Sequence, residues 1–383
     1  MKFFHLSDLH IGKHLHHYNL KEDQKKILGE IVCYARELSP DAIIIAGDIY
    51  DKSVPSAEAV EMFDDFLTSL AEIEPVVPVF IISGNHDSPE RLEYAGNILK
   101  KNHIYMAGKV PEDEEEYLQK VVLEDEYGAV FFYLLPFFKP SYIRGLVEKV
   151  PENYTEAVKL LLKRENIDYK MRNVLVSHQF YTTGTERPET CDSESISVGG
   201  LDNVDTSAVR DFDYVALGHI HGRQSTGYDH IRYCGTPLKY SVSEWNHKKT
   251  LTVVTLEDKG TPVKVTEFEL HPLRDVKKIT GALEEVIKQA DANDRNDYVS
   301  ITLTDEIEPY RPKDRLEEVY SKILEIRIDN TRTRNKLHNF EEEVKEQTPF
   351  EVFEEFYQEI QGNPLDEKQK AFVLEIMEKL GEE

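Results

Sequence analysis

The sequence predicts an α/β fold for most of the chain, followed by a small α/β unit and a pair of helices. In the first two thirds of the 383 residues, apolar runs of four to eight residues alternate with longer segments of helical period. After His271-Pro272 the same alternation restarts, and the last part of the chain holds two short amphipathic segments. We therefore expect a first domain at residues 1–270, a capping domain at 271–340 and C-terminal helices at 341–383.

The first domain is predicted from its apolar runs, which have the length of buried strands. The expected strands are Lys2–Leu6, Ala42–Ala46, Val79–Ile82, Val130–Leu135, Val174–Val176 and Val215–Leu217, with further strands at Ile231–Cys234, Thr250–Thr255 and Val263–Phe268. Leu118–Leu123 pairs with Val130–Leu135 as a hairpin across a Glu-Asp-Glu-Tyr-Gly turn. Glu22–Leu38 and Ser56–Leu70 place apolar residues on one helical face, which is typical of crossover helices.

The remaining elements follow from the same periods. In the capping domain we expect a βαβαβ order: Val276–Ile279, Leu283–Ala290, Tyr298–Leu303, Leu316–Leu324 and Ile326–Ile328. The C-terminal helices are expected at Pro349–Gln361 and Glu367–Leu380, separated by Gly362-Asn363-Pro364.

Composition excludes several classes of protein. With 40% hydrophobic and 31% charged residues, the chain is neither collagenous nor wholly disordered. The longest apolar stretch, Ala129 to Phe138, is far shorter than the roughly 20 residues of a membrane span, and the N-terminus turns polar by His5, so we expect a cytoplasmic protein without membrane contact. Three cysteines without a CxxC pair argue against a disulfide framework or a thiolate zinc site.

The net charge bears on the partners of the protein. Lys and Arg number 46 against 72 Asp and Glu, which gives −26. A field of this sign repels nucleic acid unless a local group of positive charge reverses it.

Five polar motifs directly follow five of the predicted strands. They are Asp8-Leu9-His10, Gly47-Asp48-Ile49-Tyr50-Asp51, Gly84-Asn85-His86-Asp87, Ser177-His178 and Gly218-His219-Ile220-His221. Ligands of open α/β sheets bind beyond the carboxyl ends of the strands, so we expect the five motifs to converge. Carboxylate, imidazole and amide groups without thiolate suit Mn²⁺, Fe²⁺, Mg²⁺ or Zn²⁺.

Each motif taken alone has an ordinary structural explanation. The Gly-Asp-x-x-Asp motif occurs in plain turns, Asn85 could form an Asx turn, and His178 could be a satisfied core histidine. Their joint occurrence at five strand ends of one chain favours a metal site instead.

In this order the motifs resemble those of the calcineurin-like metallophosphoesterases, a family whose fold is a β-sandwich flanked by helices. Longer stretches resemble the SbcD family of bacterial nuclease subunits, and the resemblance spans nearly the whole chain. These stretches are Ser7–Gly12, Gly47–Asp51, Ile82–Ser88 and Tyr233–Pro237 with Ser243-Glu244.

The resemblance implies a role for each polar residue of the motifs. One metal would be held by Asp8, His10, Asp48 and His221, and the other by Asp48, Asn85, His178 and His219. Asp48 would then bridge two divalent ions, with Mn²⁺ preferred. His86 would be the catalytic histidine and no ligand. Asp51 and Asp87 would orient ligand histidines, or serve only as turn carboxylates.

The resemblance also implies a function. We expect a Mn²⁺-dependent DNA nuclease subunit, an exonuclease on double strands and an endonuclease on single strands and hairpins, acting in double-strand break repair, recombination and replication. It would form a homodimer, associate with the nucleoid, and bind an SbcC-like coiled-coil ATPase through its C-terminal helices.

Two other functions are compatible with part of these expectations. The chain could be a metallophosphodiesterase of small molecules or cyclic nucleotides, although such an enzyme needs neither a capping domain nor a helical tail. It could also be an inactive adaptor of an ATPase, which the complete set of ligand residues disfavours.

Overall fold

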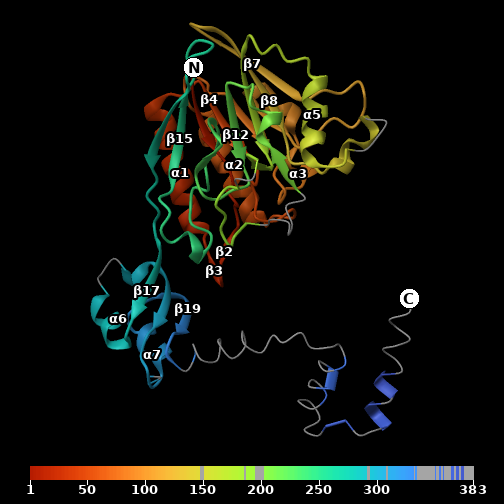
Figure 1. Cartoon of the computed structure of the whole chain (residues 1–383). Coiled ribbons are helices and arrows are strands. Elements are labelled where there is room, and N and C mark those ends of the chain that lie inside the picture. Colours follow the sequence, from red (N-terminus) through yellow and green to blue (C-terminus); the bar gives the residue numbers. More distant parts are fainter. Residues whose placement is uncertain are drawn as a thin grey trace. The chain divides into compact units, whose positions relative to one another are not determined.

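The computed structural model describes residues 1–146, 151–184, 187–194, 202–290, 294–307 and 309–331, together with short pieces between 333 and 374. Most of the expected helices Pro349–Gln361 and Glu367–Leu380 lie outside the described residues. The chain divides into two compact units. The first holds residues 1–279, 290–301 and 314–325, and the second holds 280–289, 302–313 and 326–383 (Figure 1).

The first sheet has six strands and is mostly parallel. Its order is β16 (Lys264–Glu269), β15 (Thr250–Thr255), β1 (Lys2–Leu6), β4 (Ala42–Ala46), β5 (Val79–Ile82) and β6 (Ile104–Ala107). Strands β1, β4, β5 and β6 run parallel, with Phe4 opposite Ile43 and Ile44 opposite Phe80. Strands β15 and β16 are antiparallel to their neighbours and close this edge.

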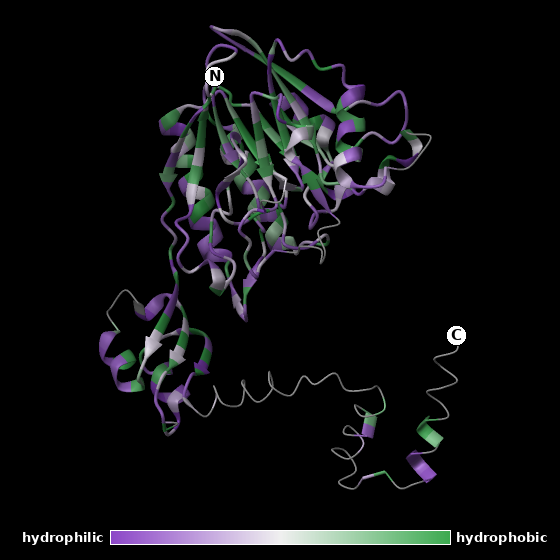
Figure 2. Cartoon of the chain, viewed as in Figure 1, coloured by the Kyte–Doolittle hydropathy of each residue, from purple (hydrophilic) through white to green (hydrophobic). Residues whose placement is uncertain are grey.

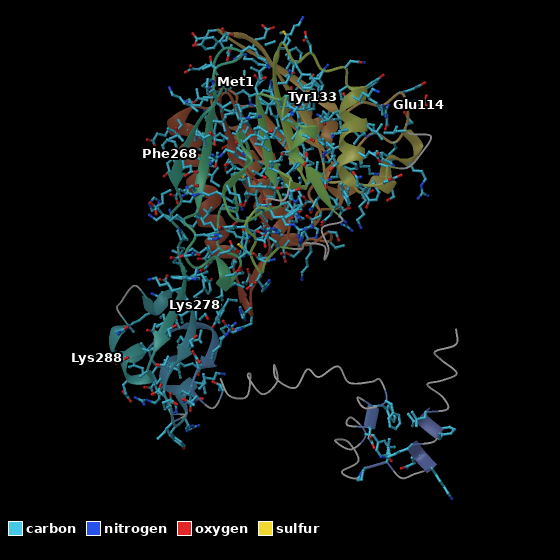
Figure 3. All side chains as sticks on the ribbon, in the orientation of Figure 1. Met1, Glu114, Tyr133, Phe268, Lys278 and Lys288 are labelled. Atoms are coloured by element: carbon cyan, nitrogen blue, oxygen red, sulfur yellow. The ribbon has the colours of Figure 1, made fainter. Side chains whose placement is uncertain are left out.

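The second sheet also has six strands. Its order is β13 (Gln224–Thr226), β14 (Tyr228–Tyr233), β12 (Tyr214–Gly218), β9 (Arg172–His178), β8 (Gly128–Leu135) and β7 (Gln119–Asp125). Its four central strands run parallel, and β7 and β13 are antiparallel at the edges. The hairpin predicted between β7 and β8 is confirmed. Phe268 lies in the first sheet and Tyr133 in the second (Figure 3).

The two sheets pack face to face, which confirms the predicted sandwich. Aromatic side chains of both sheets, among them Phe3, Phe80, Phe132 and Tyr214, form one buried cluster between them. The strands are the most continuously apolar segments of the unit (Figure 2), as expected for parallel strands covered on both faces.

Helices cover the outer faces of the sandwich. Helices α1 (Lys21–Leu38) and α2 (Ala57–Ala71) pack on the first sheet, and α5 (Tyr154–Arg164) packs on the second. The predicted apolar face of α2 is buried throughout. Helix α5 was not predicted, although Asn153 caps it through Glu156 N and its buried residues recur at helical spacing.

The region after residue 270 forms a three-stranded sheet with two helices. The sheet order is β17 (Val276–Gly281), β18 (Tyr298–Leu303) and β19 (Lys322–Ile328), and the helices are α6 (Leu283–Gln289) and α7 (Pro312–Glu317). The helix predicted over Leu316–Leu324 is wrong, because the helix ends at Glu317 and the strand begins at Lys322. Pro312 suits a first helical turn, and the β-branched Ile323, Ile326 and Ile328 favour the strand.

Short strands and short α-helices lie between the larger elements. They are β2 (His14–Leu15), β3 (Tyr18–Asn19), α3 (Pro89–Leu92), α4 (Gly96–Leu99), β10 (Phe180–Thr182) and β11 (Asn203–Asp205). Among the residues with a described placement, no helix is both long enough and apolar enough to cross a bilayer.

Candidate metal centre

The carboxyl ends of β1, β4, β5, β9 and β12 meet at one place, as predicted from the motifs. His219 N donates to both carboxylate oxygens of Asp8, at 3.0 and 3.1 Å, which joins the ends of β12 and β1 across the two sheets. Asn85 after β5 lies within 3.1 Å of His178 at the end of β9. All seven expected ligand residues therefore gather at these strand ends.

One group of donors consists of Asp8, His10 and His221. Their ligand atoms all lie within 4.8 Å of one another, and the three side chains are buried. The Nε2 atoms of His10 and His221 face each other at 3.2 Å, and Asp48 Oδ2 is 3.7 Å from His10 Nε2. Two imidazole nitrogens that direct their lone pairs at the same position, next to a carboxylate, form a set of donors that fits a divalent cation.

A second group is formed by Asn85, His178 and His219. Asn85 Oδ1 lies 2.9 Å from His219 Nδ1 and 3.1 Å from His178 Nε2, and Asp48 Oδ2 lies 3.4 Å from that same His178 atom. His178 Nδ1 donates to the Ala46 carbonyl at 2.7 Å, since a carbonyl oxygen only accepts. This bond aims Nε2 at the centre, the arrangement that metal-binding histidines need. These residues fit a second divalent ion.

Asp48 lies between the two groups, and the backbone around it is strained. Asp8, His10, Asp48 and His219 all have positive φ, between 42° and 98°. Non-glycine residues in this region cost roughly 1–3 kcal/mol each, and they cluster at functional sites. Backbone bonds from Asp8 N to Gly47 O and from His10 N to Asp48 O hold the first two loops together. These positive φ values lower the stability of the folded state, but they direct the side chains toward the centre.

The electrostatics of the centre keep most of its imidazoles neutral. Burial lowers the pKa of His10 well below its usual value and that of His219 to about 3. Burial would also lower the pKa of His178, but the Asp48 carboxylate outweighs it and raises that pKa to about 9. Without a cation, His178 and Asp48 form a buried ion pair. A bound divalent ion would take the place of the His178 proton.

His86 lies beside the two donor groups but is a member of neither. Its Nδ1 donates to the Asp51 carbonyl at 2.9 Å, and its backbone N donates to Asp48 Oδ1 at 2.9 Å. The ring is partly exposed and lines an open pocket with Asn85 and the segment Lys52–Val54. Among the described residues no hydrogen bond occupies its Nε2, which leaves this atom open to a group outside the metal positions. His86 also forms a donor group with His10 and Asp51.

The two remaining carboxylates have different contacts. Asp87 accepts hydrogen bonds from the backbone N atoms of Ile49, Tyr50 and Gly84, at 2.9–3.1 Å, and so braces the Asp48 loop instead of touching a histidine. Asp51 pairs with Lys13 at 2.8 Å and lies 3.8 Å from His10 Nδ1. The turn-carboxylate alternative thus describes Asp87 better, while Asp51 faces His10 of the first donor group.

We did not predict from the sequence the residues that position His221 through its Nδ1 and backbone N atoms. Ser193 Oγ lies 2.7 Å from His221 Nδ1, and Glu194 accepts a hydrogen bond from His221 N at 2.6 Å. Glu244 accepts a hydrogen bond from Ser193 at 2.8 Å. The Ser243-Glu244 pair belonged to a stretch carrying the family resemblance, but no motif marked Ser193 or Glu194.

Comparison with known proteins agrees with this geometry. Residues 1–223 match the family model for the calcineurin-like phosphoesterase domain. Residues 270–361 match the model for the type 5 capsule protein repressor C-terminal domain. The SbcD subunit of the nuclease SbcCD from Staphylococcus epidermidis is 32% identical over 383 residues, covering 98% of both chains.

This chain belongs to the SbcD family of calcineurin-like phosphoesterases. A second SbcD relative, from Staphylococcus saprophyticus subsp. saprophyticus, is 29% identical and covers 100% of this chain and 99% of its own. Among solved structures, phosphopantetheinyl hydrolase from Mycobacterium tuberculosis has 18% identity and a TM-score of 0.33, and it covers 62% of this chain and 90% of that one. Membership of the SbcD family makes the chain a hydrolase of phosphoesters, and its family and donor groups imply divalent metals.

Proposed function

We propose that this chain is the nuclease subunit of a two-component DNA repair complex and hydrolyses phosphodiester bonds of DNA, as an exonuclease on double strands and an endonuclease on single strands and hairpins. The observation that carries the proposal is the convergence of donors from five strand ends into two groups that meet at Asp48. Paired metal sites of this kind suit displacement at phosphorus. The relatives are named as subunits of a nuclease, which supports a nucleic acid as the substrate.

Seven residues would hold the two ions. Asp8, His10, Asp48 and His221 would form one site, and Asp48, Asn85, His178 and His219 the other. Mixed oxygen and imidazole donors without thiolate favour Mn²⁺, while Mg²⁺, Fe²⁺ and Zn²⁺ are compatible. Two ligand carboxylates against two dications leave the site positive, which attracts a phosphate in spite of the overall charge of −26.

The chemistry divides between the ions and the chain. Divalent ions bound there would supply Lewis acidity for the attack of water on phosphorus. His86, held through Nδ1 by the Asp51 carbonyl, lines the open pocket, and in its imidazolium form it would donate a hydrogen bond or proton from Nε2 to the leaving oxygen. Asp87 keeps the Asp48 loop in place through three backbone bonds.

The partners follow from the family. Residues 1–270 would carry the reaction, residues 271–340 would face DNA, and the helices of 341–383 would dock an SbcC-like coiled-coil ATPase. We further propose a homodimer that works in the cytoplasm at the nucleoid, in double-strand break repair, recombination and replication.

A nuclease assay of the purified full chain tests the proposal. A plasmid and a duplex oligonucleotide would be incubated with Mn²⁺, Mg²⁺ or chelator, with and without the ATPase, beside an Asp48→Asn control. Cleavage of DNA that needs metal and Asp48 is expected. Hydrolysis of a small phosphodiester without cleavage of DNA under any condition would favour the small-molecule alternative. Full metal loading without any hydrolysis would favour the inactive adaptor.

A further inference from the structure

A buried carboxylate lies behind the metal centre and has no part in the reaction proposed above. Glu244 ends the short 3₁₀ helix Val242–Glu244 and has 0% exposure. Its oxygens accept four hydrogen bonds, from Lys249 Nζ at 2.6 Å, Ser193 Oγ at 2.8 Å, Tyr240 N at 3.0 Å and Ser241 Oγ at 3.1 Å. Burial of a carboxylate is costly unless such contacts compensate it.

The first line of contact runs from Glu244 through Ser193 to His221. Ser193 Oγ lies 2.8 Å from Glu244 Oε1 and 2.7 Å from His221 Nδ1. An ionised carboxylate only accepts, so the single hydroxyl proton of Ser193 goes to Glu244. Ser193 must then accept from His221 Nδ1–H. This relay leaves His221 Nε2 without a proton and aimed at His10 Nε2.

The second line of contact runs from Glu244 through Tyr240 to His10. Tyr240 N donates to Glu244 Oε1, and the Tyr240 hydroxyl donates to the carbonyl of Leu9, next to His10 in the chain. The Tyr240 ring packs edge-on against His10, with centroids 5.5 Å apart, and against His221 at 6.1 Å. One carboxylate thus fixes both histidines of the first donor group.

Lys249 allows Glu244 to remain charged in this buried place. Its ammonium lies 2.6 Å from Glu244 Oε2 and also donates to the carbonyl of His221 at 3.0 Å. Lys249 is only 8% exposed, so the pair is shielded from water. Removing one member would leave the other uncompensated.

The second donor group is held by other contacts. His178 Nδ1 donates to Ala46 O, and His219 is fixed through Asp8 and Asn85. Within the part of the chain that the structure describes, Glu244 makes no hydrogen bond to either of them. Asp8 and Asp48 connect the two groups, whereas the contacts of Glu244 through Ser193 and Tyr240 lead to the first group.

We propose that Glu244 is a positioning residue, acting through Ser193 and Tyr240, that sets the affinity of the metal site of Asp8, His10 and His221 while leaving the site of Asn85, His178 and His219 unaffected. This inference rests on the proposed function only in requiring that the two donor groups bind divalent ions. It predicts a selective loss of one metal, which a general loss of structure would not produce.

Titration of the full chain with Mn²⁺, followed by calorimetry and electron paramagnetic resonance, tests the inference. Wild type should bind two equivalents and give the spectrum of a coupled pair of ions. Ser193→Ala and Glu244→Gln should each weaken one equivalent by roughly 10–100-fold, the usual effect of a residue that orients a ligand. The other equivalent should keep its affinity and show the spectrum of an isolated ion.

Ser243→Ala is the matched control, because Ser243 lies in the same 3₁₀ helix as Glu244 but bonds Ser241 and Asp192 N instead of Glu244. It should retain both equivalents of Mn²⁺.

Ser193→Ala decides the outcome if Glu244→Gln does not fold, since the serine substitution removes no charge. Two unchanged equivalents in Ser193→Ala, or an equal weakening of both, would overturn the positioning role. A wild-type chain that binds no Mn²⁺ would instead overturn the proposed function.

Discussion

Asp48 lies between the two donor groups and is the residue that we propose to bridge the two metal ions. Its Oδ2 atom lies 3.7 Å from His10 Nε2 and 3.4 Å from His178 Nε2, one from each donor group. Asp48→Asn removes the charge of the shared ligand while keeping its shape. We expect DNA cleavage to be abolished and both equivalents of Mn²⁺ to bind more weakly, as measured by metal analysis of the purified variant. Two full equivalents with normal cleavage would show that Asp48 does not bridge.

His86 should behave differently from the ligands. Its Nδ1 is held by the Asp51 carbonyl, and its ring lies at the edge of the open pocket. His86→Gln should keep the metal content near that of wild type and lower turnover by roughly 10²–10⁴-fold, the usual contribution of a general acid. Parallel measurement of Mn²⁺ content and initial rate separates the two effects. Loss of one metal would make His86 a ligand, and unchanged turnover would make its role structural.

His5 gives the stability of the fold a dependence on pH. It is fully buried between the Tyr214 hydroxyl and the Leu217 carbonyl, and burial lowers its pKa to about 3. In the unfolded chain its pKa is about 6.5, so the unfolded state binds more protons between pH 3 and pH 6.5. The free energy of unfolding should therefore fall as the pH drops below 6.5, by about 2 kcal/mol between pH 7 and pH 5 from this residue alone.

Urea unfolding of the metal-free chain at the two pH values measures this contribution. In His5→Gln, the loss of stability between pH 7 and pH 5 should be smaller than in wild type by about 2 kcal/mol. Equal losses in both proteins would show that His5 does not carry the effect.

At the scale of elements, the crossing of β12 and β4 needs a residue without a side chain. A Cβ atom on Gly218 would overlap the Ala46 carbonyl oxygen and lie 2.7 Å from His178 Nδ1. Gly218→Ala must therefore push the two sheets apart and break the bond between His178 and Ala46. We expect weaker Mn²⁺ binding and a loss of about 1–3 kcal/mol or more in stability, the range of overpacked cores.

Gly29 in α1 is the control for this substitution, since nothing lies within 4 Å of its added Cβ. Gly29→Ala should leave metal binding unchanged and raise stability slightly, by about 0.5–1 kcal/mol, because alanine favours the helix. Thermal unfolding of both variants checks the difference. Equal effects would mean that the close approach of β12 and β4 is unimportant.

At the scale of the whole molecule, the acidic tail should serve a partner and not the hydrolase. Residues 341–383 hold 14 acidic and 4 basic residues, a charge of −10, and the apolar stripes predicted there are too short to form stable isolated helices. We expect the tail to dock in a groove of the ATPase, steered by its charge toward basic surface.

Deletion of residues 345–383 should leave a folded phosphoesterase that binds Mn²⁺ but no longer co-purifies with the ATPase. Circular dichroism, metal analysis and pull-down of the complex measure the three properties. Complex formation at wild-type affinity, or unfolding of the truncated chain, would assign the tail to the protein's own core.

The sequence by itself determined the strands and the place of the site. The runs Lys2–Leu6, Ala42–Ala46 and Val79–Ile82 match β1, β4 and β5 residue for residue, because parallel strands covered on both faces are mostly apolar. Polar residues directly after such strands must lie at the carboxyl edge of a sheet. The convergence of the five motifs followed from that rule, whereas the division of their residues into two ligand sets came from the family resemblance.

Only the tertiary structure decided what holds the site. Ser193 and Glu244 are separated from His221 by 28 and 23 residues, yet both lie behind it. Similarly, the segment after Glu317 became β19 instead of continuing a helix. Such contacts arise from loops and strands that meet through the packing of two sheets, so no local period or spacing encodes them. Local pattern determines which face of an element is buried, but long-range packing determines which side chains meet there.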